Sequence, residues 1–456
     1  MPTITPATFR GPITSDSDHL PFRSCLHPRS RHHLDLGALG YVEEEWLVDG
    51  VADAHDARDE RIASAVPFTT RLLVRRPVRP DACSGSVHIE ALHNISETSA
   101  TWNVAGRWMV ERGHAWIGVT TSSGTFAVPG SAMSGGVTHL QHVDPDRYRD
   151  LHLESFTEPP AARGGGGPVD MDALRRDLAM ATAHGVGAMA AIVSTLRTGG
   201  ASGPLAGRPL ERLHASGWSQ TGNFWSSFLE RGFDDELQRA RDGGPAVDTY
   251  LVAVAPPPIE RRERCERRAI LVNLLSESEV AGTLVDPMTS AVDADDPPTR
   301  GYEVPGSFHL WHLGYGGHFA VADHDATRHN DRSWGMLVPA LLDGIDRWSR
   351  GGPPLPHEPR ITRDPSAADG IARDAVGNAL GGVRTAWVDV PTARYLPRCA
   401  CSPVIGEMRP FDADTLAATH SSDVARAATW SEAVGSMASR GWLLPADAAT
   451  LRTHPE

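Results

Sequence analysis

The chain of 456 residues contains no lysine. Without an ε-amine there can be no Schiff base to pyridoxal phosphate or to a substrate, because that linkage needs a lysine nitrogen. The phosphate-binding lysine of the P-loop and the Ser-Lys pair of penicillin-binding proteins are missing for the same reason. The absence therefore excludes kinases, transaminases and penicillin-binding enzymes.

Long apolar runs are also missing. No window reaches 18 apolar residues, and the first twenty residues, MPTITPATFRGPITSDSDHL, lack a charged segment followed by an apolar one. We therefore expect a soluble, cytoplasmic protein with no membrane partner.

Cysteine is scarce, and no two cysteines form a CxxC pair. An odd number without that spacing argues against a zinc knuckle or a disulfide scaffold and fits a reducing compartment. The five cysteines are Cys25, Cys83, Cys265, Cys399 and Cys401.

Positive charge is in deficit, with 43 basic residues against 57 acidic ones and a net charge of -14. Proteins that neutralise phosphates carry a basic stripe or patch, and this chain has none. Nucleic acid is not an expected partner.

The chain is long enough for two domains or for one elaborated α/β domain. Residues 1–38 are predicted to form an irregular N-terminal arm, residues 39–351 the core, and residues 352–456 an extension packed on that core. Strand patterns alternate with helical ones, which predicts a mostly parallel sheet flanked by helices, with a helical insertion. The predicted strands are 41–53, 68–77, 85–94, 114–121, 212–219, 249–255, 268–275 and 307–314.

The stretch GWSQTG, from Gly217 to Gly222, lies between the strand pattern RLHAS and the helix pattern NFWSSFLERG. A serine on a sharp turn from strand to helix, with small residues two positions before and after it, is typical of a nucleophile elbow. The common pattern GxSxG has glycine where this chain has Thr221. The stretch predicts Ser219 as a nucleophile.

An elbow of this kind requires an acid and then a histidine later in the chain, each just past a strand. The segment SESE after the strand pattern AILVNLL offers Glu277 and Glu279, and YGGHFA after the predicted strand at 307–314 offers His318. We favour Glu279 as the acid and leave Glu277 as the alternative.

These residues predict acyl transfer. His318 would take the proton of Ser219 as the hydroxyl attacks an ester carbonyl, and the glutamate would hold the imidazole in the correct tautomer. The oxyanion hole needs two backbone N–H groups, for which we expect Gln220 and a residue of the loop at Asn94 or Ile95.

The matching segments resemble the bacterial "alpha/beta hydrolase domain" family of serine esterase-like proteins. They include YVEEEWLVDGVA, GSVHIEALHN, GWSQTG, LLSESEV, WHLGYGGHFA and GWLLPADAATL, and they extend from about residue 40 to 451. The resemblance implies the alpha/beta-hydrolase fold, with the C-terminal block integral to it. It also implies a triad of Ser219, an acid of the SESE turn and His318, with no cofactor.

The expected substrate is a small ester or lactone. Aromatic residues near the proposed site predict a bulky apolar or aromatic group on it, and these are Trp218, Trp225, Trp311 and Tyr315. A pathway enzyme that uses the same pocket for acyl transfer, cyclisation or lyase chemistry is an alternative.

A metal-dependent hydrolase is a further alternative, because five histidines occur between residues 309 and 329. The HLWH segment is strand-like, so two histidines three apart would lie on opposite faces, which disfavours a shared metal. The histidines are His309, His312, His318, His324 and His329. The segment GVGAMA matches a dinucleotide-binding fingerprint, but a helix pattern precedes it where a strand is required.

Overall fold

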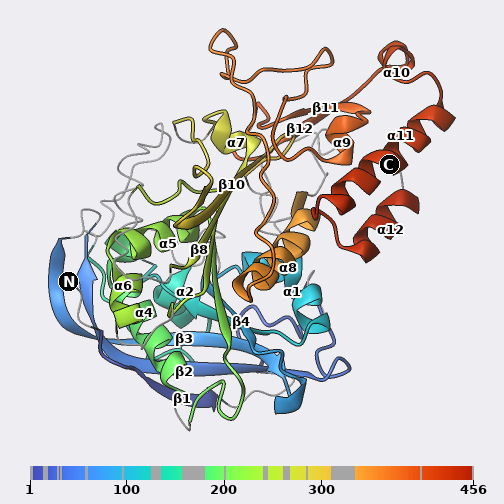
Figure 1. Cartoon of the computed structure of the whole chain (residues 1–456). Helices are drawn as coiled ribbons and strands as arrows, with labels where there is room; N and C mark the ends of the chain where they lie inside the picture. The colour runs from blue at the N-terminus through green and yellow to red at the C-terminus, as the bar shows by residue number, and fades with distance from the viewer. Residues whose placement is uncertain are drawn as a thin grey trace. The chain divides into compact units, whose positions relative to one another are not determined.

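The computed structural model (Figure 1) divides into two compact units. The first comprises Met1–Val252 and Pro257–Ile270, and the second Ala253–Pro256 and Leu271–Glu456. The structure describes residues 4–13, 19–27, 30, 33–56, 60–94, 97–124, 135–156, 180–199, 202–239, 245–259, 268–283, 286–309, 334–400 and 403–453.

Strands of the first unit follow the order β1-β2-β3-β5-β4-β6-β7. The edge from β1 to β5 is antiparallel, whereas β4 runs parallel to both β5 and β6. The strands are β1 (Thr8–Ile13), β2 (Tyr41–His55), β3 (Arg61–Pro77), β4 (Ser86–Leu92), β5 (Ala115–Thr120), β6 (Arg212–Trp218) and β7 (Thr249–Ala253). The N-terminal arm was expected to be irregular, and this is wrong for β1, which pairs with β2.

The helices of this unit pack on those strands. Helix α1 contacts β5 and β6, α4 contacts β2, and α5 contacts β6, while α4, α5 and α6 touch one another (Figure 1). The helices are α1 (Ala100–Glu111), α2 (Gly136–Val143), α4 (Ala183–Thr198), α5 (Gln220–Glu230) and α6 (Phe233–Arg239).

The segment GVGAMA lies within α4. A Cβ at Gly185 would stand 1.9 Å from the carbonyl oxygen of Thr121, and one at Gly187 would stand 2.4 Å from that of Asp53. These glycines therefore serve the close approach of the helix to the backbone of the strands. That packing explains them without a dinucleotide.

Strands of the second unit follow the order β8-β10-β9, with β8 (Ile270–Ser276) parallel to β10 (Pro298–Val304) and β9 (Ala294–Asp295) antiparallel to it. The remaining elements of this unit are α7 (Glu277–Val280), α8 (Leu337–Ser349), α9 (Ala386–Asp389), β11 (Ala393–Leu396), β12 (Glu407–Pro410), α10 (Ala413–Thr419), α11 (Asp423–Ser439) and α12 (Pro445–Thr453).

The strand predicted at 307–314 is wrong where the structure describes it, because Ser307–His309 lie outside any strand and β10 ends at Val304. Strand β10 has the sequence PTRGYEV, with charged residues at buried positions. Arg300 donates to the carbonyl of Leu355 at 3.0 Å, and Glu303 accepts from the N–H groups of Ser290 at 3.0 Å and Ile361 at 2.9 Å. Because this strand buries hydrogen-bonded charged side chains, it lacks the apolar pattern by which a strand is recognised in a sequence.

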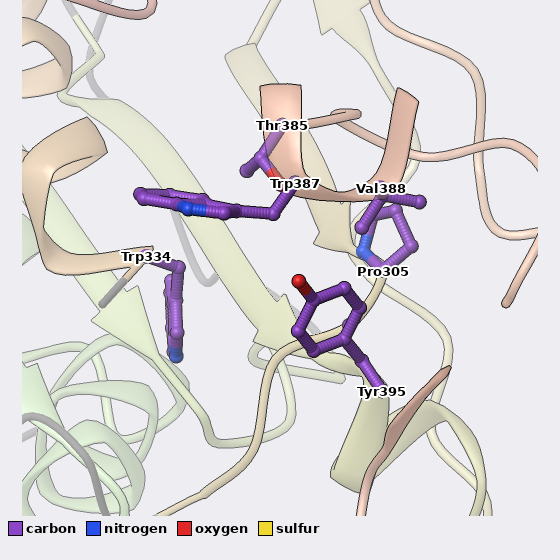
Figure 2. A pocket seen from close by; sticks show the side chains of 7 residues that line it. Pro305, Trp334, Thr385, Trp387, Val388 and Tyr395 are labelled. Atoms are coloured by element: carbon purple, nitrogen blue, oxygen red, sulfur yellow. The ribbon is translucent and has the colours of Figure 1, made fainter. Parts of the chain in front are cut away.

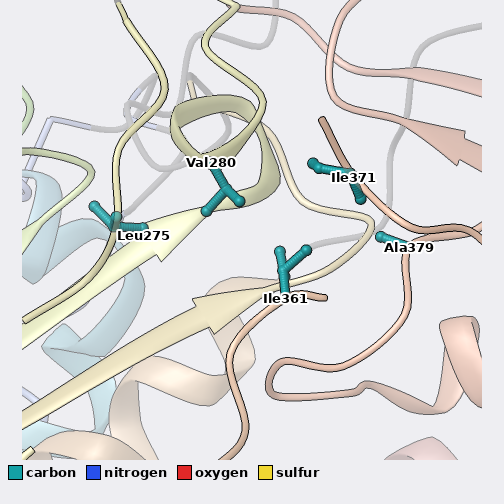
Figure 3. Close-up of a cluster of buried hydrophobic side chains, with 5 residues drawn as sticks. All are labelled: Leu275, Val280, Ile361, Ile371 and Ala379. Atoms are coloured by element: carbon teal, nitrogen blue, oxygen red, sulfur yellow. The ribbon is translucent and has the colours of Figure 1, made fainter. Parts of the chain in front are cut away.

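Residues after 352 pack on β8, α7 and β10. A buried apolar cluster joins residues of the strand and helix to residues of the extension (Figure 3). Its members are Leu275, Val280, Ile361, Ile371 and Ala379. The extension therefore shares a core with the strand that precedes the predicted acid.

Candidate active site

Ser219 occupies the single turn residue between β6 and α5. Its φ of 55° and ψ of -118° are strained for a residue with a side chain. The sequence thus folds into the turn that the elbow pattern predicts, and the strain turns the serine out of the line of the strand.

Small size is required at Gly217. A Cβ there would stand 2.1 Å from the carbonyl oxygen of Thr221 and 2.7 Å from the ring of Trp225. Thr221 fills the position that is usually glycine, and its hydroxyl accepts from the N–H of Trp218 at 2.9 Å and donates to the carbonyl of Trp218 at 3.0 Å. The threonine side chain therefore stabilises the turn through two hydrogen bonds to the backbone of Trp218.

Thr221→Val is expected to lower the free energy of unfolding by about 1–2 kcal/mol, because the methyl group cannot replace either hydrogen bond in a buried turn. Urea unfolding measures this change. Thr221→Ser keeps the hydroxyl and is the matched control. A valine variant as stable as the serine variant would contradict a stabilising role of these two hydrogen bonds.

The loop after β4 lies beside the elbow. Glu90 of β4 pairs with Ser216 of β6 in the parallel register. Asn94 and Gln220 each follow four residues later in the chain, just past the ends of these strands, so both lie at the same sheet edge. Glu97 holds this loop, since its carboxylate accepts from the N–H of Gly136 at 2.8 Å and from the hydroxyl of Thr120 at 2.5 Å. Ile95, the other residue predicted for the oxyanion hole, lies outside the described residues.

Buried Glu90 fixes the helix that follows this loop. Its carboxylate accepts from the N–H of Thr101 at 2.7 Å and from the indole of Trp116 at 2.8 Å, and burial raises its pKa to about 7. The hydroxyl of Thr101 in turn lies 2.8 Å from that of Ser216 on β6. These contacts connect the start of α1 to the strand that carries Ser219.

Trp218 and Trp225 lie in the core of the first unit. Neither ring is exposed, and their indole N–H groups donate to the hydroxyl of Thr101 at 2.9 Å and to the carbonyl of Ser216 at 2.8 Å. Complete burial with satisfied N–H groups favours a packing role for both. Trp311 and Tyr315 lie outside the described residues.

In the second unit, Glu279 contacts a histidine. Nδ1 of His309 lies 2.6 Å from Oε1 of Glu279, and both side chains are at least 93% buried. The other oxygen, Oε2, accepts from the N–H of Ser276 at 2.9 Å and from its hydroxyl at 2.6 Å. Because a carboxylate only accepts, Nδ1 carries the proton, and Nε2 is the nitrogen that can take up another.

Glu277 has a different set of partners. Its carboxylate accepts from Arg373 at 2.8 Å and from the N–H of Gly306 at 2.7 Å. Burial raises its pKa, and the arginine opposes that shift. Glu277 therefore ties the end of β10 to the C-terminal extension, and of the two glutamates it is Glu279 that contacts a histidine.

The contact between His309 and Glu279 was not predicted from the sequence. His318, the predicted catalytic histidine, lies outside the described residues, so its role stays a prediction. The parallel register pairs Ser276 with Val304, so α7 and the segment after β10 leave the sheet at the same edge. Glu279 and His309 each follow within five residues of those strand ends. Placing the last strand at 298–304 would have pointed to His309.

The described residues contain no group of three or more histidine, cysteine or acidic side chains that could hold a metal ion. Four of the five histidines considered above, His312 to His329, lie outside the described part of the chain. The fifth, His309, is held by Glu279.

Cysteine chemistry differs from expectation at one residue. Cys399 is disulfide-bonded, whereas Cys25 and Cys83 are free. A disulfide at Cys399 was not expected from the cysteine spacing, because bond formation needs proximity in the fold and not a CxxC spacing. The side chain of Ser278 in α7 donates to the carbonyl of Pro397 at 2.6 Å, so the segment before this cysteine packs on α7.

A small cavity lined by aromatic side chains lies beside Pro305 and Gly306, just after the end of β10. Figure 2 shows the rings of Trp334, Trp387 and Tyr395 around it, with the Tyr395 hydroxyl directed between the two indoles. Its volume of about 10 Å³ is room for roughly one water molecule. It is too small to hold a substrate group in this conformation.

Among the described residues, no helix is both long and apolar enough to cross a lipid bilayer.

The model of the "Alpha/beta hydrolase domain" family matches residues 9–453, almost the entire chain. The chain belongs to this family. The fold class expected from the sequence is thereby confirmed. No curated protein matches the chain.

Solved structures similar to this family member include esterases, at low identity. Esterase Est22 is 10% identical over 47% of this chain and 44% of its own, with a TM-score of 0.24. The rice cell wall degrading esterase LipA of Xanthomonas oryzae is 10% identical over 48% of this chain and 46% of its own, with the same score. Acetyl xylan esterase 1 of Thermoanaerobacterium sp. is 9% identical over 51% of this chain and 68% of its own, with a TM-score of 0.24. The chain thus spans less than half of the first two.

Proposed function

We propose that the protein is a serine hydrolase that cleaves a carboxylic ester or lactone through an acyl-enzyme. The observation that carries the proposal is the strained turn at Ser219, between a strand and a helix. The Glu279–His309 contact supports it, because a carboxylate on Nδ1 prepares Nε2 to act as a base. Ser219, Glu279 and His309 follow β6, β8 and β10 in the chain order of this fold.

In the proposed mechanism His309 takes the proton of Ser219 while the serine oxygen attacks the carbonyl carbon. The tetrahedral oxyanion receives hydrogen bonds from the backbone N–H of Gln220 and from one in the loop at Asn94 and Ile95. His309 then gives its proton to the leaving alcohol, and water repeats the sequence on the acyl-enzyme. Each oxyanion donor is worth roughly 10²–10³ in rate.

Labelling with a fluorophosphonate tests the nucleophile. We expect the probe to modify Ser219 in the full chain, as located by peptide mapping, and Ser219→Ala to remain unlabelled. Ser227→Ala, on the helix that follows the elbow, is the control and should label normally. Modification of another residue, or unchanged labelling of the Ser219 variant, would contradict the assignment.

A further inference from the structure

Three buried side-chain oxygen atoms in segments that leave the sheet at the edge of the elbow have no hydrogen-bond partner among the described residues. They are Oδ1 of Asn94, Oε1 of Gln220 and Oγ1 of Thr121. Their residues are 3%, 6% and 2% exposed. Leaving a buried polar group unpaired costs stability, so each needs a partner that the fold itself does not supply.

The three residues come from three adjacent strands. Thr121 follows β5, Asn94 follows β4 and Gln220 follows β6, in the order β5-β4-β6. The pairs Leu92 with Thr120 and Glu90 with Ser216 set the register. Neighbouring strands lie about 4.8 Å apart. The unpaired groups therefore share one sheet edge with Ser219.

Two other polar side chains near this edge, those of Glu97 and Thr221, are hydrogen-bonded, unlike the three oxygens named above. The carboxylate of Glu97 accepts two hydrogen bonds, and the hydroxyl of Thr221 makes two. A chain that pairs such groups within the same loop and turn has no general shortage of partners there.

We propose that Asn94, Gln220 and Thr121 form a polar subsite for a hydroxyl-bearing acyl group, next to the carbonyl that Ser219 attacks. A hydroxyl group both donates and accepts, as does the Thr121 hydroxyl, and the amide oxygens accept. This inference rests on the proposed hydrolase function and deepens it by naming the substrate class. It replaces the apolar or aromatic group expected from Trp218 and Trp225, which lie in the core.

The test compares ethyl lactate with ethyl propanoate, which differ by one hydroxyl. The readout is the ratio of the kcat/KM value for ethyl lactate to that for ethyl propanoate. The ratio of each variant is divided by the ratio of the wild type, so that the difference in intrinsic reactivity of the two esters cancels. Thr121→Val and Asn94→Leu remove the polar atoms with little change in shape. We expect each to reduce the preference for lactate by about tenfold, with no loss of thermal stability.

Thr70→Val is the matched control, because its buried hydroxyl already donates to the carbonyl of Thr120 at 2.5 Å. It should lower stability and leave the ratio unchanged. Equal ratios in wild type, Thr121→Val and Asn94→Leu would overturn the subsite, since groups paired by water alone do not discriminate the esters. Lower stability of both subsite variants with an unchanged ratio would do the same.

Binding to Ser219→Ala separates the two proposals. Calorimetric titration with the same two esters needs no turnover. Tighter binding of lactate, lost in the double variant with Thr121→Val, would support the subsite even if Ser219 failed to label. Equal binding together with normal Ser219 labelling would overturn the subsite and leave the hydrolase assignment in place.

Discussion

His309→Ala is expected to lower kcat for ester hydrolysis by on the order of 10⁵. In the proposed mechanism the imidazole that Glu279 holds at 2.6 Å is the base that activates the serine, so the alanine variant would have nothing to take the proton. Rates are measured on an ester that the wild-type enzyme turns over, at saturating concentration. The variant should retain its fold, since the lost side chain belongs to a contact at the end of α7.

Two comparisons make this result specific. His357→Ala removes a second histidine that faces a carboxylate, Asp293 at 2.8 Å, but on the surface, and it should leave kcat within a few-fold of wild type. His318→Ala tests the sequence prediction directly. A loss of on the order of 10⁵ with His318→Ala, and a small one with His309→Ala, would assign the base to His318.

Sequence patterns pointed to the turn at Ser219 and to Glu279 because local geometry requires particular residue types there. Gly217 has no room for a Cβ, and a serine between a strand and a helix is rarely placed in such a turn without need. Glu279 is the third residue of α7 and forms a capping box with Ser276, so the chemistry of the cap and the position after β8 coincide. Both signals are contained in a few consecutive residues.

The contact of His309 with Glu279 was not predicted because its signal in the sequence is not local. Strand β10 carries Arg300 and Glu303 at buried positions, and each has one partner more than fifty residues away, Leu355 and Ile361 respectively. Apolar periodicity therefore placed the predicted strand at 307–314, although β10 ends at Val304. The predicted strand end then fell after His309. Only the fold shows that the C-terminal extension satisfies those charges.

The role of aromatic residues was also beyond the sequence. Trp218 and Trp225 flank Ser219 in the chain, but the alternation of a strand and the rotation of a helix turn both rings inward. Proximity to the nucleophile in sequence does not place a side chain in its pocket. The unpaired oxygens of Asn94 and Gln220 carry information that only the buried structure reveals.

Glu279→Gln is expected to lower kcat by on the order of 10⁴ with little change in stability. The glutamine oxygen can keep the hydrogen bonds from Ser276, which turns the amide nitrogen toward Nδ1 of His309. An N–H group there forces Nδ1 to accept, so the proton moves to Nε2 and the ring can no longer act as a base.

Glu277→Gln is the matched change two residues earlier, and it should show the opposite balance. Its carboxylate is one of two that pair with Arg373, so the variant leaves this largely buried cation with Asp369 alone and should lose about 1–3 kcal/mol of unfolding free energy. Its kcat should fall far less than that of Glu279→Gln, because no histidine depends on it among the described residues. Parallel measurement of kcat and urea unfolding separates the two glutamates. A collapse of kcat in Glu277→Gln with an active Glu279→Gln would exchange their roles.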